Sequence, residues 1–310
     1  MKAIRFALGS LLFVAFVSSA SNGQTGSSPR TFVSGTAPFG NPCSRLAPCR
    51  TFVEALTQTL PGGEIVVLDS GGYGPAPVTI THAVSIIAPA GVYAGISVTS
   101  GAGIDINAGG SDTVILRGLT VASQGSTGPG IVFQSSGTLH VESCVANGFG
   151  GGDGIFCNGG GRLEVKDSIF RGNLAGIEII GTSTAAVDQV RLEGSPGGFG
   201  LAVESGAKVT VRNSIASGNT VGFLALTNTA AAVELNIEGC VVSNNSQIGI
   251  QAESDATGVA LVRVSNSTVT DNGIGLQNVG SPALLLSRGN NTVEGNTTNT
   301  TGTIGSYTAK

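Results

Sequence analysis

The chain of 310 residues contains no tryptophan, three tyrosines, one methionine and two histidines. Only 11% of its residues are charged, so Ser, Thr, Asn and Gly must cover most of the surface. Such a surface is unusual for a helical protein and typical of a sheet-rich protein with many turns. Hydrophobic residues make up 41% of the chain, which is enough for a continuous core and argues against disorder.

Long hydrophobic runs are also scarce, and the clearest one lies at the start. Lys2 and Arg5 precede the apolar run 6–17, and a small-x-small cleavage site ends at Ala20, so residues 1–20 are predicted to be a Sec-type signal peptide. The run is too short to span a bilayer and no second one follows, so we expect a secreted or periplasmic protein without a transmembrane anchor. Removing residues 1–20 changes the formal net charge from −4 to −6, and such an acidic protein is a poor candidate for binding nucleic acid.

An eleven-residue motif, called the recurring phrase below, occurs three times, as DSIFRGNLAGI (167–177), NSIASGNTVGF (213–223) and NSTVTDNGIGL (266–276). A glycine followed by an apolar residue recurs every 22 to 27 residues, at Gly130, Gly154, Gly176, Gly200, Gly222, Gly249 and Gly275. Short alternating stretches separated by Gly, Asn or Ser lie between these glycines, which is the pattern of half-buried strands joined by turns. No repeat carries a helical period.

Short strands in a repeat of nearly constant length predict an all-β parallel solenoid, with one turn per repeat and equivalent residues stacked about 4.8 Å apart. About ten turns fit between Gly62 and the C-terminus. One predicted stack of asparagines at a corner comprises Asn173, Asn219, Asn245, Asn272 and Asn296. The unit VDQVRLEGSPGG (187–198) lacks the phrase and predicts a looser corner. A β-sandwich, the alternative fold, does not explain stacks that stay in register over seven repeats.

The glycine onsets and SxVxxN corners resemble the right-handed parallel β-helix repeat of the pectin-lyase-like superfamily. The segment NPCSRLAPCRTFVEALTQTLPGGEIVVLDSGGYG (41–74) resembles the N-terminal cap of exported bacterial β-helix proteins, most of which have no assigned function. Residues 50–60 predict a capping helix whose buried face comprises Phe52, Val53, Leu56 and Leu60. The predicted organisation is a signal peptide (1–20), an N-terminal loop and capping helix (21–61), a single-stranded right-handed parallel β-helix of about ten coils (62–305) and a C-terminal tail (306–310).

Five cysteines in an exported chain raise the question of disulfides. Cys43 and Cys49 lie in a Pro-flanked loop of the cap and are expected to pair, which would pin this loop to the helix. Cys144 and Cys240 share one stack but lie four turns apart, roughly 19 Å, which is too far for a disulfide. Cys157 is predicted to face inward with the core. We therefore expect the last three to be buried and free.

The enzymes of the superfamily that this chain resembles act on acidic polysaccharides, usually in a groove along one sheet. The strand after each glycine is the predicted groove face, and its outward residues are Val132, Gln134, Phe156, Asn158, Glu178, Ile180, Ala202, Glu204, Leu224, Leu226, Gln251, Glu253, Gln277 and Val279. Glu178 and Glu204 lie on neighbouring turns, on the order of 8 Å apart, within the roughly 6.5–9.5 Å of an inverting carboxylate pair. They are the candidate catalytic residues. The candidate ligand-binding residues are Asn158, Gln251, Glu253 and Gln277.

The predicted face nevertheless lacks groups that the resemblance implies. It carries no Arg, Lys or His, whereas the lyases use a cationic base and calcium-binding acids, and it lacks the clustered aspartates of the polygalacturonase-like hydrolases. Phe156 is its single aromatic residue. Neither the cysteines nor His82 and His140 have companions at ligand spacing, so no metal or cofactor is expected.

Three functional hypotheses remain. The preferred one is a non-catalytic monomer whose rigid face binds a polysaccharide or cell-surface glycan. The second is a polysaccharide hydrolase or lyase that uses Glu178 and Glu204. The third is a purely structural surface or adhesion protein. The Thr- and Asn-rich segment 290–310 predicts a polar, loosely ordered end that covers the last open sheet edge.

Overall fold

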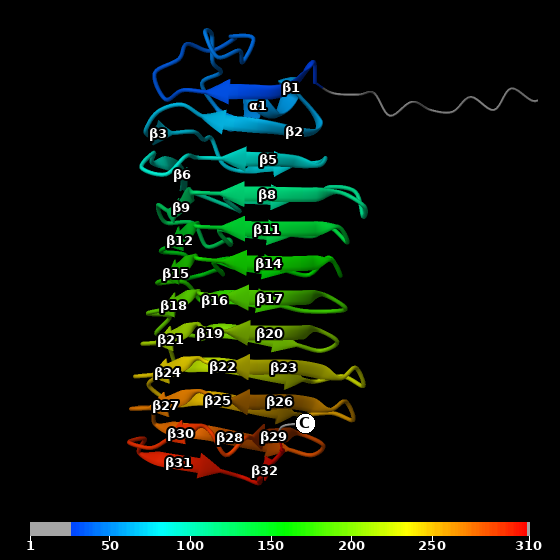
Figure 1. Cartoon of the computed structure of the whole chain (residues 1–310), viewed down its shortest axis with the longest axis vertical. Coiled ribbons are helices and arrows are strands. Elements are labelled where there is room, and N and C mark those ends of the chain that lie inside the picture. The colour runs from blue at the N-terminus through cyan, green and yellow to red at the C-terminus, as the bar shows by residue number, and fades with distance from the viewer. Residues whose placement is uncertain (1–25, 309–310) are drawn as a thin grey trace, which may run out of the picture.

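The computed structural model describes residues 26–308 and shows a right-handed parallel β-solenoid of about ten turns with one short helix near its N-terminal end (Figure 1). Each turn contributes one strand to each of three parallel sheets, which we call sheets A, B and C. The predicted fold is therefore confirmed. The predicted signal peptide, residues 1–20, lies outside the described residues.

The strands of the three sheets stack in chain order. Sheet A contains β1 (Ser28–Val33), β2 (Thr59–Val67), β5 (Val84–Ile87), β8 (Thr113–Arg117), β11 (Thr138–Glu142), β14 (Arg162–Lys166), β17 (Thr184–Asp188), β20 (Lys208–Arg212), β23 (Val233–Glu238), β26 (Ala260–Ser265), β29 (Leu284–Ser287) and β32 (Ile304–Ser306). Sheet B contains β3 (Gly71–Gly72), β6 (Ala94–Val98), β9 (Leu119–Ser123), β12 (Val145–Asn147), β15 (Ile169–Arg171), β18 (Arg191–Glu193), β21 (Ile215–Ser217), β24 (Val241–Ser243), β27 (Thr268–Thr270) and β30 (Thr292–Val293). Sheet C contains β4 (Val78–Ile80), β7 (Ile104–Ile106), β10 (Ile131–Phe133), β13 (Ile155–Cys157), β16 (Ala175–Ile179), β19 (Phe199–Glu204), β22 (Val221–Thr227), β25 (Ile248–Ser254), β28 (Ile274–Gly280) and β31 (Thr298–Thr301).

The asparagine stack exists, and Asn219, Asn245, Asn272 and Asn296 form a hydrogen-bonded ladder between sheets B and C. The side-chain oxygen of Asn245 accepts from the backbone amide of Asn219 at 3.1 Å and from its side-chain amide at 3.1 Å. The unit without the phrase keeps the same corner, because Ser195 takes the asparagine position and its backbone amide donates to Asn219 at 3.0 Å. Strand pairing stays in register through β18, but the side-chain ladder is interrupted at this corner, because the buried Ser195 hydroxyl makes no hydrogen bond within residues 26–308.

The corner between sheets A and B is a separate structure with left-handed backbone. Asp167, Asn213 and Asn266 have φ values of 50°, 51° and 48°, and Gln189 adopts 56° at the equivalent place. Asn and Asp tolerate this region better than most residues because their short side chains form local hydrogen bonds. The recurring phrase thus encodes two corners, the second of which is the asparagine ladder.

The repeated glycines form an inward-facing column next to the asparagine ladder. A Cβ atom on Gly200 would lie 2.6 Å from the carbonyl oxygen of Gly222 and 3.1 Å from the side-chain nitrogen of Asn219. Gly222 faces Gly249 in the same way, at 2.5 Å. Glycine therefore recurs because the backbones of neighbouring coils approach too closely for any side chain.

The N-terminal cap is a seven-residue helix, α1 (Phe52–Gln58), closed by a capping box in which Thr51 and Glu54 bond each other's backbone amides. Its buried residues are Phe52, Ala55 and Leu56. The predicted buried face is therefore partly wrong. Val53 is 38% exposed, because a helix this short buries only positions three and four apart, and Leu60 lies in β2.

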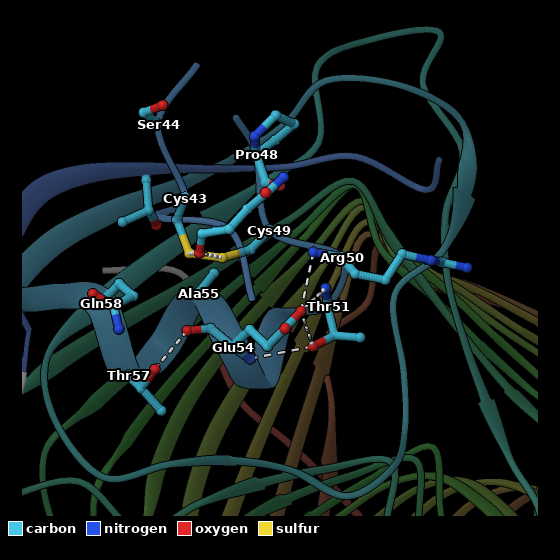
Figure 2. Close-up of a disulfide and its surroundings, with 12 residues drawn as sticks. Cys43, Ser44, Pro48, Cys49, Arg50, Thr51, Glu54, Ala55, Thr57 and Gln58 are labelled. Atoms are coloured by element: carbon cyan, nitrogen blue, oxygen red, sulfur yellow. Dashed lines mark hydrogen bonds between the residues drawn. A yellow bond between two sulfur atoms is a disulfide. The ribbon is translucent and has the colours of Figure 1, made fainter. Parts of the chain in front are cut away.

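The disulfide between Cys43 and Cys49 is confirmed, and it lies beside Ala55 of the helix (Figure 2). The segment before the helix, predicted to be a loop, also contains the strand β1. The Cys43 carbonyl accepts from the Phe32 amide at 2.8 Å, and the Cys49 amide donates to the Phe32 carbonyl at 2.9 Å. The disulfide loop is thus fixed to β1 as well as to the helix.

The C-terminal end is more ordered than expected. Residues 298–301 and 304–306 form β31 and β32, which extend sheets C and A by one strand each. The Tyr307 hydroxyl donates to the Val264 carbonyl at 3.3 Å, and the guanidinium of Arg288 lies 4.9 Å from the Tyr307 ring. The prediction of a loosely ordered end is therefore wrong over residues 298–307.

Candidate functional site: the outer face of sheet C

The predicted outward residues lie in two columns on the outer face of sheet C. Backbone pairing sets the first column as Phe156, Glu178, Ala202, Leu224, Gln251 and Gln277. The second column contains Glu204, Leu226, Glu253 and Val279. Each strand of the sheet is hydrogen-bonded on both sides except at the two ends, so the side chains stand on a rigid backbone.

The candidate catalytic residues Glu178 and Glu204 are diagonal neighbours. Glu178 pairs with Ala202 on the next strand, and Glu204 lies two residues further along that strand. This offset corresponds to about 8 Å between Cα atoms. Burial raises the pKa of Glu204, and the charge of Glu178 raises it further.

A third carboxyl, that of Asp153, joins this pair and is absent from the predicted site residues. It is only 7% exposed, and one of its oxygens accepts from the backbone amide of Ala175 at 3.2 Å. Its side chain contacts that of Glu178. Burial, followed by the charge of Asp153, raises the pKa of Glu178 to about 7. Burial also raises the pKa of Asp153 itself.

The signal for Asp153 is present in the sequence, although an Asp-Gly pair is more typical of a turn. Asp153 directly precedes Gly154, and the residue before each ladder glycine faces outward because the glycine itself faces inward. Strict alternation counted from the glycine therefore overlooks this column. Its members are Asp153, Ala175, Phe199, Val221, Ile248 and Ile274.

Of the candidate ligand-binding residues, Gln251, Glu253 and Gln277 lie together. The side-chain amide of Gln251 donates to Glu253 at 2.9 Å, and Gln277 pairs with Gln251 on the neighbouring strand. Asn158 is exposed and follows β13, four strands away from β25, so it does not join this group.

An apolar surface adjoins both the carboxyls and the glutamines on the outer face of sheet C. We call it the outer apolar patch, and it comprises Phe199, Val221, Leu224, Leu226, Ile248 and Ile274. It forms a hydrophobic cluster separate from the main core inside the coil. The strands β19 to β28 thus present an apolar strip on the outer face, which shares β19 with Glu204 and shares β25 and β28 with the two glutamines.

The three free cysteines and His140 do not contribute to this face. Cys144, Cys157 and Cys240 are free and buried, as expected, and Cys157 pairs with Phe133 and Ile179 on the inner side of sheet C. His140 lies on β11, with Nδ1 3.1 Å from Glu164. Within residues 26–308 no group of three or more His, Cys, Asp or Glu side chains is placed to hold a metal ion.

Solved structures similar to this chain are polysaccharide lyases. The crystal structure of pectate lyase Pel9A aligns with a TM-score of 0.64 and 17% identity, over 88% of this chain and 78% of that one. The crystal structure of alginate lyase from Paenibacillus sp. str. FPU-7 aligns with a TM-score of 0.50 and 14% identity, over 82% and 96%. At these identities the likeness shows a shared fold.

Sequence comparison gives the family. No curated protein matches the chain significantly. The helix α1 is far too short to cross a membrane, and the described residues contain no other candidate span. Residues 107–310 match the family described as "Periplasmic copper-binding protein (NosD)", and the chain belongs to this family of parallel β-helix proteins.

Proposed function

We propose that this protein is an exported, periplasmic or secreted β-helix that binds a glycan along the outer face of sheet C without cleaving it. The observation that carries this proposal is the composition of that face. Carboxyls and amides flank an apolar patch on one continuous ten-stranded sheet. Ligand sites combine apolar surface with a few positioned polar groups, and sugar rings offer both kinds of partner.

The geometry supports a long ligand better than a compact one. Ten strands at about 4.8 Å give a face roughly 43 Å long. Because the backbone is hydrogen-bonded throughout, the side chains are held in place before a ligand arrives, which lowers the entropic cost of binding. The polysaccharide substrates of the similar lyases agree with this kind of ligand.

The copper in the family's description does not fit the donors of the described residues. Copper favours Cys and Met sulfur or His nitrogen. Burial raises the pKa of Cys144 and of Cys240 to about 11, which opposes the thiolate form that a metal requires. His82 and His140 belong to different coils. Equilibrium dialysis against copper should leave the folded protein without a stoichiometric metal, and stoichiometric retention would contradict this interpretation.

A glycan array followed by titration of the best binder tests the proposal. The double variant Gln251→Ala/Gln277→Ala should weaken binding about tenfold or more, because two hydrogen-bonding amides are lost. Thr210→Ala on the outer face of sheet A is the matched control and should leave affinity unchanged. If the array yields no ligand at millimolar concentration, the proposal fails, and the result favours a structural surface or adhesion protein.

Hydrolysis is a second candidate, favoured by the different environments of Glu178 and Glu204. With a pKa raised to about 7, Glu178 can hold a proton at neutral pH and donate it to the glycosidic oxygen. Glu204 as carboxylate would take a proton from water, whose oxygen attacks the anomeric carbon as the glycosidic bond breaks. The products are two sugars, each with a new hydroxyl group.

A screen for reducing ends and for unsaturated products against a polysaccharide panel separates these functions. Hydrolysis predicts reducing ends that disappear in Glu178→Gln. Unsaturated products would indicate a lyase. Activity that survives Glu178→Gln together with Glu204→Gln would remove both residues from any catalytic role. The expected monomer is tested on the same preparation by light scattering after size exclusion.

A further inference from the structure

On the outer face of sheet A, acidic and basic side chains of neighbouring strands are paired. One column on that face alternates in sign from strand to strand, as Arg117, Glu142, Lys166, Asp188, Arg212 and Glu238. Arg117 lies 2.5 Å from Glu142, and Arg212 lies 3.3 Å from Asp188. Acids on this face are therefore placed in register with cations.

Sheet C is built differently. Its strands contain no Lys, Arg or His, whereas Asp105, Glu178, Glu204 and Glu253 are all acidic. None of the ion pairs among residues 26–308 involves these four acids or Asp153. The acids on the outer face of sheet C therefore have no cationic partner in this part of the chain, whereas those on the outer face of sheet A do.

The buried carboxyl of Asp153 increases the energetic cost of the unpaired acids on sheet C. It is more than nine-tenths buried, its one backbone donor is the amide of Ala175, and its side chain faces the carboxyl of Glu178. Holding acids together without a cation opposes their ionisation and destabilises the folded chain. A positively charged ligand would relieve that repulsion when it binds.

The adjoining outer apolar patch indicates which kind of positively charged ligand would fit this face. Phe199 and Leu226 are partly exposed and pack against the buried part of the patch. Phe199 lies on the same strand as Glu204, and Leu226 pairs with Glu204 on the next strand. A single metal ion would gain nothing from this apolar surface. An extended molecule with apolar ring faces and regularly spaced ammonium groups would use the patch and the acids together.

We propose that the ligand of sheet C is a cationic glycan, a chain of amino sugars with free ammonium groups that pair with Glu178 and Glu204 while ring faces lie on the outer apolar patch. This inference rests on the proposed function and names its ligand class. Glu253 extends the acidic row, because it lies in the column of Glu204 two strands further on, about 9.6 Å away. Polyanionic glycans meet repulsion along the same path.

Calorimetric titration with two oligosaccharides of equal length tests the inference. One is a β-1,4-linked glucosamine hexamer with free amines, and the other is its fully N-acetylated counterpart, which has the same backbone without the charge. The amine form should bind at least about tenfold more tightly, because each charge-assisted contact contributes about that factor. The preference should shrink as salt concentration rises.

The double variant Glu178→Gln/Glu204→Gln keeps the shape of both side chains and should abolish the preference for the amine form. Glu238→Gln removes a charge from sheet A and should leave it intact. Equal affinity of wild type for the two hexamers, or tighter binding of a pectate oligomer, would overturn the cationic ligand but leave glycan binding standing. If neither hexamer nor any glycan of the array binds, both proposals fall. The wild-type comparison decides even if the double variant does not fold.

Discussion

The side-chain oxygen of Asn272 accepts two hydrogen bonds from Asn245, one from its backbone amide at 3.0 Å and one from its side-chain amide at 2.9 Å. Asn245 repeats this arrangement toward Asn219. Asn245→Ala would leave the buried backbone amide of Asn219 without an acceptor, and the side-chain amide of Asn219 would keep only its bond to the Leu192 carbonyl. We expect the free energy of unfolding to fall by roughly 2–4 kcal/mol.

Urea denaturation followed by circular dichroism measures this loss. Asn147→Ala on β12 is the control, since Asn147 is half-buried and makes no side-chain hydrogen bond within residues 26–308. It should change the free energy of unfolding by less than about 0.5 kcal/mol. Equal effects of the two substitutions would mean that the ladder does not stabilise the coil.

The glycine column predicts a sharp contrast between two nearby positions. In Gly200→Ala the new Cβ would lie 2.6 Å from a backbone oxygen that the sheet holds in place, so the substitution should destabilise the chain by about 1–3 kcal/mol or more. A Cβ atom on Gly197 would meet no other atom within 4 Å, so Gly197→Ala should be nearly neutral. Thermal denaturation of both variants checks this contrast, and a tolerated Gly200→Ala would contradict the close approach of the coils.

Glu178 should make stability depend on pH. Its pKa is raised from 4.5 to about 7 in the folded chain, so between these values the folded state keeps a proton that the unfolded chain has released. The free energy of unfolding should therefore fall as pH rises through this window, and level off above it. Allowing for partial exposure of the side chain, the change is about 1–2 kcal/mol.

Glu178→Gln cannot ionise and should lose this dependence. Relative to wild type, the variant should gain stability between pH 5 and pH 8, as measured by urea denaturation at both values. Glu238→Gln should not reproduce that gain. A stability difference between Glu178→Gln and wild type that stays constant with pH would show that Glu178 is not held near Asp153 in solution.

The disulfide should contribute to the cap. Cys43 and Cys49 are six residues apart, and closing a loop of this size stabilises a fold by about 2 kcal/mol. Reductant should therefore lower the melting temperature of the wild type. The double variant Cys43→Ala/Cys49→Ala should melt at the lower temperature with or without reductant. A further reductant effect in that variant would point to another disulfide.

Local pattern predicts the coil, the asparagine ladder and the outward position of Glu178, because a repeat fixes each residue's place relative to its equivalents. It misplaces Val53, which lies on the outward side of the helix, and Leu60, since the helix ends before this residue where the chain enters β2. It also misses Asp153, whose direction depends on an inward glycine that interrupts strict alternation. The contact between Asp153 and Glu178 arises from stacking across coils, which spacing along one coil does not reveal.

The absence of cations from the outer face of sheet C can be read from the sequence, whereas the pairing of opposite charges on sheet A cannot. Arg117 and Glu142 are 25 residues apart, and their pairing becomes apparent once strand register is known. The structure shows that acids on sheet A meet cations in register and that acids on sheet C do not. The register of the sheets is therefore the observation on which the proposed cationic ligand rests.

A crystal structure of the protein with the tightest-binding oligosaccharide would test glycan binding on sheet C most directly. We predict sugar density along the outer face of sheet C, crossing β16, β19 and β22 within hydrogen-bond distance of Glu178 and Glu204. Density over sheet A or sheet B, with sheet C bare, would contradict this prediction.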